Sequence, residues 1–140
     1  MLLIDNSAWA RLDSSRLPVQ RRTEVAKRLE QGEIVVSVPF LLEAGWSARS
    51  ARHHDELLDD LLRLPRITID GSIEDIALAA QADLARRGHH RSAAPSDLLI
   101  AACAHANGAG VLHYDRDFDI LTDLTRLQFT SQWLAPAGTL

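Results

Sequence analysis

Two short apolar runs, one near each end of the chain, are each followed by an aspartate. Residues 1–4 lead into Asp5, and residues 110–114 lead into Asp115. Short apolar runs that alternate with longer helical patterns are typical of the buried strands of a parallel sheet. Because ligands bind at the carboxyl ends of the strands in open α/β sheets, we expect both aspartates at the binding edge of one sheet.

The periodicity of apolar residues predicts the remaining elements. Strands are expected at residues 2–5, 34–38, 66–69, 111–114 and 127–130. Helices are expected at residues 19–31, 39–50, 53–64, 73–87 and 96–107, with a short helix after Asp115. This order predicts an α/β protein, a three-layer α/β/α sandwich with a mostly parallel sheet of four to five strands. A length of 140 residues with 46% hydrophobic content suits a single domain, residues 1–140.

Two further acidic residues lie in predicted helices. Glu43 is inside the helical stretch 40–46, and Asp97 opens the apolar stretch 96–102. Carboxylates about 6 Å apart repel by roughly 3 kcal/mol at an effective dielectric constant near 20, so clustered acids must bind protons or hold a cation. Oxygen ligands of this kind suit hard cations such as Mg²⁺ or Mn²⁺. The alternative is that each acid caps its own helix or is solvated at its own strand end.

The residues around these four acids occur in a characteristic order. They read Asp5-Asn6-Ser7-Ala8-Trp9, then Pro39-Phe40-Leu41-Leu42-Glu43, then Pro95-Ser96-Asp97-Leu98-Leu99-Ile100-Ala101-Ala102, and finally His113-Tyr114-Asp115-Arg116-Asp117-Phe118-Asp119. With these segments, over essentially its whole length, the chain resembles the PIN-domain ribonucleases and, within them, the VapC toxins of bacterial VapBC toxin–antitoxin pairs. One departure is visible, because Asn6 stands where many relatives have threonine. Ser7 keeps the hydroxyl that usually bonds to the acidic cluster.

The resemblance implies a Mg²⁺- or Mn²⁺-dependent endoribonuclease that hydrolyses RNA phosphodiester bonds with metal-activated water. It implies catalytic and metal-binding roles for all four acids, with Asp5 and Asp97 as the shared core and Glu43 and Asp115 completing the site directly or through water. Ser7, Asp117 and Asp119 are expected to orient the metal ligands or a water molecule without contacting the metal themselves. Asp117 and Asp119 can instead be simply solvated. The alternative function is a catalytically idle PIN-like module that binds RNA or protein.

The net charge of −4 is unusual for a protein that binds nucleic acid. Its basic residues are nevertheless clustered. Candidate RNA-binding residues precede Asp97, and they are Arg86, Arg87 and Arg91. A second basic patch follows Glu43 and consists of Arg49, Arg52, His53 and His54. Both patches can instead be solvated helix ends, where cations complement the helix dipole.

The resemblance also implies protein partners. These are a small VapB antitoxin, whose C-terminal segment would present an arginine to the acids, and a second copy of the chain in a homodimer. Apolar helix faces are candidates for the core or for an interface, and they carry Leu41, Leu42, Leu57 and Leu61. Trp46 lies three residues after Glu43 and is a candidate for the edge of the antitoxin groove, whereas Trp9 and Trp133 are expected in packing.

Other classes of protein fit the sequence less well. A phosphoacceptor receiver domain needs a lysine late in the chain, where Lys27 is the only lysine, and a haloacid-type phosphatase needs an aspartate at the position of Ser7. Cys103 is a single cysteine in an apolar stretch and is expected in the core. No apolar run approaches the roughly 18 residues of a membrane span, and no basic leader precedes Asp5. The expected location is therefore the cytoplasm.

Overall fold

A four-stranded parallel sheet forms the centre of the computed structural model, which describes residues 1–140. The strands are β1 (Leu2–Ile4), β2 (Ile34–Val35), β3 (Gly110–His113) and β4 (Thr130–Trp133), in the order β2-β1-β3-β4. Leu2 pairs with Ile34 on one side and with Gly110 on the other. A side chain at Gly110 would come within 2.8 Å of Leu2 and 3.0 Å of the Thr130 carbonyl oxygen, so glycine permits the close approach of these strands.

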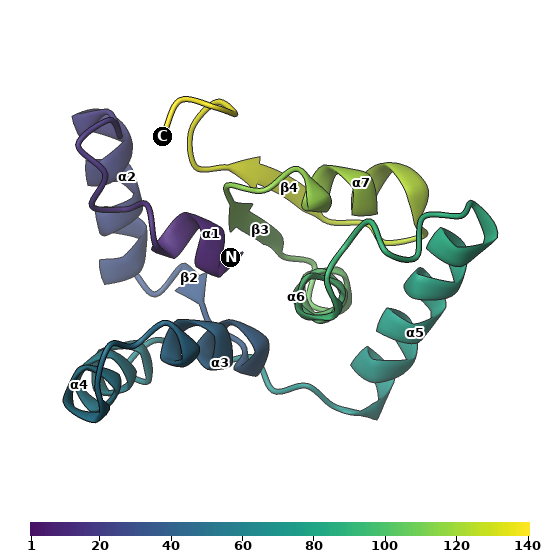
Figure 1. Ribbon diagram of the computed structural model, residues 1–140, viewed down its shortest axis with the longest axis horizontal. Coiled ribbons are helices and arrows are strands. Elements are labelled where there is room, and N and C mark those ends of the chain that lie inside the picture. Colours follow the sequence, from purple (N-terminus) through teal and green to yellow (C-terminus); the bar gives the residue numbers. More distant parts are fainter.

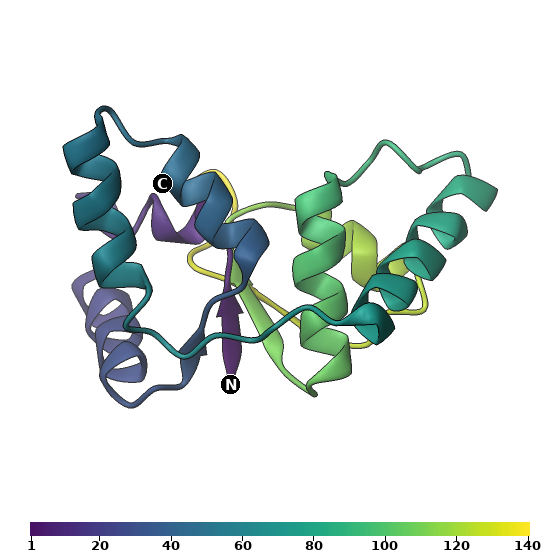
Figure 2. The same ribbon diagram turned by 90° about the horizontal axis from the view of Figure 1, so that it is seen from below.

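Seven helices surround the sheet. They are α1 (Asn6–Trp9), α2 (Val19–Glu30), α3 (Val38–Trp46), α4 (Ala51–Leu61), α5 (Gly71–Arg86), α6 (Pro95–Ala106) and α7 (Asp117–Leu124). Along the long axis of the molecule, α2, α3 and α4 lie towards one end and α5, α6 and α7 towards the other, with the strands between them (Figures 1 and 2). The predicted α/β/α class with a parallel sheet is therefore confirmed.

Helix α6 packs at the centre of the fold because nearly all of its residues are small or apolar. Residues 100–104 are fully buried, among them Cys103, which is a free thiol in the core. The helix packs against β1 and β3 as well as against its helical neighbours α3, α5 and α7. The first turn of α6 carries Asp97, so the rigid core fixes this carboxylate in place. Gly108 ends the helix with a φ of +60°, a conformation that glycine adopts without strain.

Two predicted strands require correction. Residues 66–69 do not form a strand, because only Arg66 bridges to Val36 before the chain at Val36 turns into α3. The last strand lies at Thr130–Trp133 instead of residues 127–130. The Leu127 amide bonds to the hydroxyl of Thr125 in a turn after α7, and this turn delays the start of the strand. The sheet accordingly has four strands, the lower end of the expected range.

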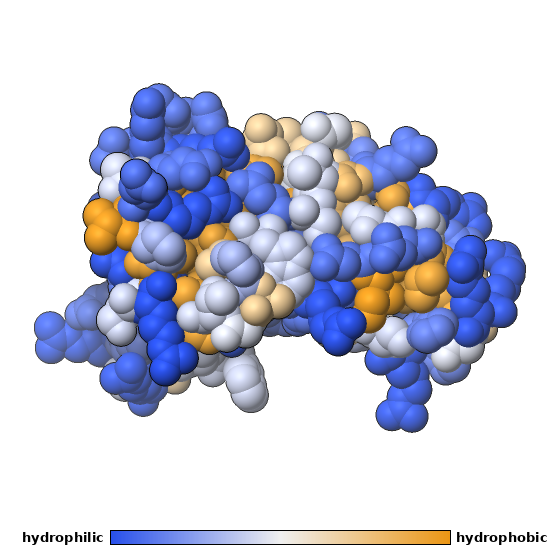
Figure 3. Space-filling model, turned by 90° about the horizontal axis from the view of Figure 1, so that it is seen from above, coloured by the Kyte–Doolittle hydropathy of each residue, from blue (hydrophilic) through white to orange (hydrophobic).

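The helices follow the predicted pattern with shifted ends. Helix α3 ends at Trp46 because Ser50 caps a new helix, α4, by accepting a hydrogen bond from the His53 amide. The one-turn helix α1 was not among the predicted helices, and the Asp5 side chain caps it. None of the helices is long and apolar enough to cross a membrane. On the face seen in Figure 3, hydrophilic side chains gather towards the two ends and a less polar band lies between them.

Candidate metal centre

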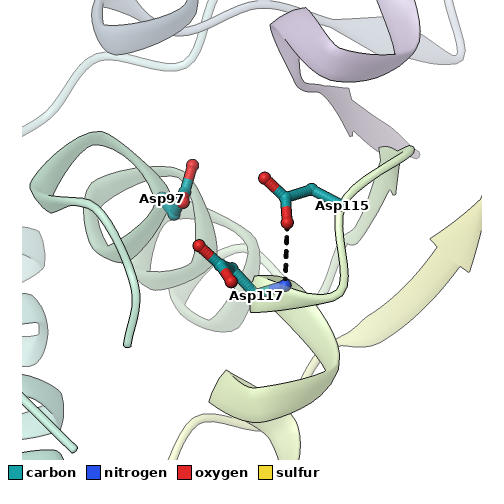
Figure 4. A group of neighbouring side chains, drawn as sticks. All are labelled: Asp97, Asp115 and Asp117. Atoms are coloured by element: carbon teal, nitrogen blue, oxygen red, sulfur yellow. Dashed lines mark hydrogen bonds between the residues drawn. The ribbon is translucent and has the colours of Figure 1, made fainter. Parts of the chain in front are cut away.

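Three aspartates from neighbouring elements point their carboxylates at one another. Asp97 comes from the first turn of α6, Asp115 follows β3, and Asp117 opens α7. One oxygen of each lies within 4.8 Å of the others, and Figure 4 shows the three side chains converging. The Asp115 carboxylate also accepts a hydrogen bond from the Asp117 amide at 3.0 Å. This spacing suits a divalent cation with oxygen ligands.

Asp5 stands beside this group in a buried position. Its Oδ2 atom accepts hydrogen bonds from the Ser7 amide at 2.8 Å and the Ser7 hydroxyl at 2.5 Å. Its Oδ1 atom is buried with no partner. Burial is the main cause that raises the pKa of Asp5, and repulsion from Glu43 adds to it. A buried carboxylate oxygen without a donor is costly, and a cation at this position would compensate it.

Glu43 is held in place by a partner from another helix. Its Oε1 atom accepts a hydrogen bond of 2.6 Å from the hydroxyl of Ser96. Ser96 directly precedes Asp97, so this bond ties the middle of α3 to the first turn of α6. Glu43 is therefore on the same side of the fold as Asp97, and its charge reaches Asp5.

Electrostatic repulsion links the acids into one group. The pKa of Asp97 is raised to about 7, first by burial and then by the charges of Asp5, Asp115 and Asp117. The pKa of Asp117 is also raised, by burial and by Asp115. Carboxylates that resist ionisation together are the expected state of an oxygen-ligand metal site without its ion. The unpartnered Asp5 oxygen and this donor set both fit Mg²⁺ or Mn²⁺.

The raised pKa of Asp97 predicts that the metal-free protein loses stability as the pH rises. This carboxyl titrates near 3.8 in the unfolded chain and near 7 in the folded protein. The folded state therefore binds more protons in this window, and the free energy of unfolding should fall by at most about 4 kcal/mol from acid to neutral pH. Urea unfolding in EDTA at several pH values measures the slope. An Asp97→Asn variant with the same slope as the parent would contradict the assignment.

The three residues expected to support the cluster differ in position. Ser7 bonds Asp5, and its hydroxyl also accepts a hydrogen bond of 2.9 Å from the Tyr114 amide, so it joins the ends of β1 and β3. Asp117 lies in the cluster itself instead of behind it. The structure does not bring Asp119 to the cluster, because its two oxygens accept hydrogen bonds from Ser131 and Trp133 of β4. Asp119 therefore does not contact the cluster, and its role in orienting ligands or water stays a prediction.

The two basic patches differ in how much charge is free. Arg86 forms an ion pair of 3.1 Å with Asp83, which also pairs with Arg126 at 2.7 Å. Arg87 and Arg91 are exposed and form no ion pair. In the second patch, Arg52 pairs with Glu56 on α4. Arg49 of the second patch is likewise exposed and forms no ion pair, so each patch keeps guanidinium charge available to an anionic ligand: Arg87 and Arg91 before α6, and Arg49 before α4.

Two polar residues of this region were not predicted from the sequence. Ser96 is adjacent to Asp97, but its partner Glu43 is 53 positions away, and no local pattern indicates that contact. His113 is fully buried in β3, where it accepts a hydrogen bond from the Asp115 amide at 3.1 Å and contacts the Ser131 hydroxyl at 2.6 Å. The contact with Ser131 depends on the pairing of β3 with β4, and the sequence predicted this last strand at residues 127–130 instead of Thr130–Trp133.

Comparisons with known proteins agree with this geometry. The PIN domain family matches residues 2–124. The chain is 36% identical to Ribonuclease VapC18 of Mycobacterium tuberculosis, covering 98% of this chain and 97% of that protein. It is 39% identical to Ribonuclease VapC2 of the same species over 88% of this chain and 86% of the relative. The fold is similar to that of DNA-bound VapBC from Salmonella typhimurium, with a TM-score of 0.72, 21% identity and coverage of 96% and 100%.

Proposed function

Because the chain belongs to the PIN domain family and, within it, to the VapC ribonucleases, we propose that it is a metal-dependent endoribonuclease and the toxin of a VapBC pair. The observation that supports this best is the convergence of Asp97, Asp115 and Asp117 on one site. Asp5 is close enough for its charge to act on Asp97, and Glu43 is close enough for its charge to act on Asp5. Incubation of the purified chain with structured RNA, with and without divalent cations, tests the proposal.

The proposed ligands of Mg²⁺ or Mn²⁺ are Asp5, Glu43, Asp97 and Asp115, and the position of Asp117 adds it to this set. Such an ion supplies a nucleophile from water at neutral pH and charge stabilisation for the phosphodiester. Around it, Ser7 fixes the Asp5 carboxylate and Ser96 fixes that of Glu43. These bonds orient the acids in advance, so little ordering remains when substrate and ion bind.

RNA contact by the basic loop before α6 is the second part of the proposal. If Arg87 and Arg91 contact phosphates, their replacement by alanine should weaken RNA binding. The slope of the logarithm of the binding constant against the logarithm of the salt concentration should become shallower by roughly 0.7 for each lost contact with single-stranded RNA. Arg86→Ala is the matched control, because Arg86 already pairs with Asp83 and should change the slope less. Binding titrations at several salt concentrations measure this. An unchanged slope in the double variant would mean that the loop is only solvated.

The antitoxin is proposed to bind across the exposed face of α3 and α4. Trp46 is 88% exposed and Leu42 is 68% exposed, which is unusual for side chains of this size. Both line a hollow of about 540 Å³ between the two helices, together with Leu58 and Leu62. Glu43 lies on α3 between Leu42 and Trp46. Glu43 does not itself line the hollow. The proposed segment therefore has to continue beyond the hollow to present an arginine, whose guanidinium matches carboxylate geometry, to the acids.

The apolar residues expected in a core or an interface separate into two groups. Leu41 and Leu61 are buried in the core, whereas Leu57 is partly buried and Leu42 is exposed. Trp9 packs on the ring of Phe40, and Trp133 packs on the rings of His113 and Tyr114. The exposed surface is thus available for partners. We propose that the protein is a homodimer in the cytoplasm, which sizing chromatography of the purified chain tests.

A catalytically idle binding module is the competing function. Such a module would still bind RNA or protein, but it would not cleave RNA when divalent cations are added. The clustered acids favour catalysis, because an idle module has no use for repelling carboxylates held together by the fold. Cleavage assays with EDTA distinguish the two functions directly.

A further inference from the structure

A continuous series of hydrogen bonds connects Asp119 to the backbone of Asp115. The Asp115 amide donates to His113 Nδ1 at 3.1 Å. His113 Nε2 contacts the Ser131 hydroxyl at 2.6 Å, and that hydroxyl contacts Asp119 Oδ1 at 2.6 Å. The series therefore crosses from the α7 helix through β4 and β3 to the segment that carries two acids of the metal centre.

The direction of every proton in this series is fixed by its two ends. An amide can only donate, so His113 Nδ1 must be the acceptor and Nε2 must carry the proton. Nε2 then donates to the Ser131 oxygen, and the Ser131 hydroxyl donates to Asp119, whose carboxylate only accepts. Trp133 Nε1 donates to the other Asp119 oxygen at 2.9 Å. Burial lowers the pKa of His113 to about 4, which agrees with a neutral ring.

A polar series in this position is not needed for packing. His113 is fully buried between the rings of Phe118 and Trp133, whose centroids are 4.9 Å and 5.1 Å from its own. An apolar ring would fill the same space without the cost of burying polar groups. The feature that an apolar ring cannot reproduce is the acceptor for the Asp115 amide.

Side-chain hydrogen bonds also restrain the backbone on either side of Asp115, but they do not involve the Asp115 amide. The Tyr114 amide donates to Ser7, and the Asp117 amide donates to the Asp115 carboxylate at 3.0 Å. The Asp115 amide itself depends on His113. A small rotation of this peptide would move a carboxylate that lies within 4.8 Å of Asp97 and Asp117.

We propose that Asp119, Ser131 and His113 are positioning residues that hold Asp115 in the geometry needed to bind the metal ion. The inference rests on the proposed function and extends it to residues outside the acidic cluster. It gives Asp119 a role at a distance, through two intervening side chains. Groups that orient a metal ligand typically change metal affinity or activity by 10- to 100-fold when removed.

Ser131→Ala tests this inference, because it breaks the series at its centre while removing a single oxygen atom. We expect the Kd for Mn²⁺, measured by calorimetry, to rise about 10-fold, and the Asp115 amide to exchange faster with solvent. The kcat for RNA cleavage should fall while KM stays near that of the parent. Ser131→Thr restores the hydroxyl on a strand and should restore Mn²⁺ affinity. Asp119→Asn gives a second, nearly isosteric break at the far end, with the same expected direction.

Thr122→Val is the matched control. Thr122 also uses its hydroxyl in one hydrogen bond, to the backbone oxygen of Asp119, but it is outside the series. It should leave Mn²⁺ affinity unchanged even if the melting temperature falls. Parental Mn²⁺ affinity in both Ser131→Ala and Asp119→Asn would overturn the inference. Failure of the proposed function is distinguishable, because then the parent itself would not bind Mn²⁺ or Asp97→Asn would bind it equally well.

Discussion

Asp97→Asn is expected to reduce RNA cleavage by at least about 1000-fold, because several kcal/mol of metal-dependent transition-state stabilisation depend on this site. The change removes one negative ligand with little change in volume. The asparagine oxygen can still accept the hydrogen bond that Asp97 receives from the Ala94 amide. Growth arrest on expression should disappear together with cleavage. Single-turnover cleavage of a labelled RNA measures the loss.

The same variant should be more stable than the parent when metal is absent. Removing the charge of Asp97 relieves repulsion from Asp5, Asp115 and Asp117. Asp123→Asn is the matched control, because it makes the same change at an exposed position of α7. The control should cleave RNA at the parental rate. Cleavage at the parental rate by Asp97→Asn would show that the acidic cluster is not the catalytic centre.

Co-expression with the cognate VapB antitoxin should suppress cleavage almost completely, and the two proteins should elute together in sizing chromatography. Trp46→Ala should weaken this complex by about 30-fold or more, since exposed tryptophans that become buried commonly contribute 2 kcal/mol or more to an interface. Cleavage by free protein should remain unchanged in this variant. Calorimetric titration with a peptide of the antitoxin C-terminal segment gives the affinity.

A pair of leucines controls for the loss of exposed apolar surface. Leu42 on α3 and Leu78 on α5 are 68% and 65% exposed, so Leu42→Ala and Leu78→Ala remove similar groups at different faces. Only the first should weaken binding of the antitoxin segment. Equal effects from the two variants, or no effect of Trp46→Ala, would place the antitoxin elsewhere.

The sequence predicted the sheet edge well because the relevant strands are short and almost entirely apolar, His113 at the end of β3 being the exception. Burial on both faces requires this composition, so the ends of β1 and β3, and with them Asp5 and Asp115, could be located from the pattern alone. Glu43 and Asp97 lie on helices, where an acid is most often just solvated. Their place in the group followed from the resemblance to PIN-domain ribonucleases instead of from periodicity.

The details that could not be predicted are contacts between distant segments. The position of β4 depends on the turn at Thr125. Because of this turn, the strand begins at Thr130 and not at Leu127, where the predicted strand began. That displacement brings Ser131 to His113 and so determines where Asp119 points. The bond from Ser96 to Glu43 likewise exists only because α3 packs against α6. Local pattern contains no information on such pairs.

Cleavage of structured RNA by the purified chain, freed of any partner and dialysed against EDTA, decides whether these acids form a metal-dependent ribonuclease centre. We expect no cleavage in EDTA, cleavage on addition of Mg²⁺ or Mn²⁺, and none with either ion in the Asp97→Asn variant. Cleavage that persists in EDTA, or that Asp97→Asn retains in Mn²⁺, would contradict a metal-dependent ribonuclease centred on these acids.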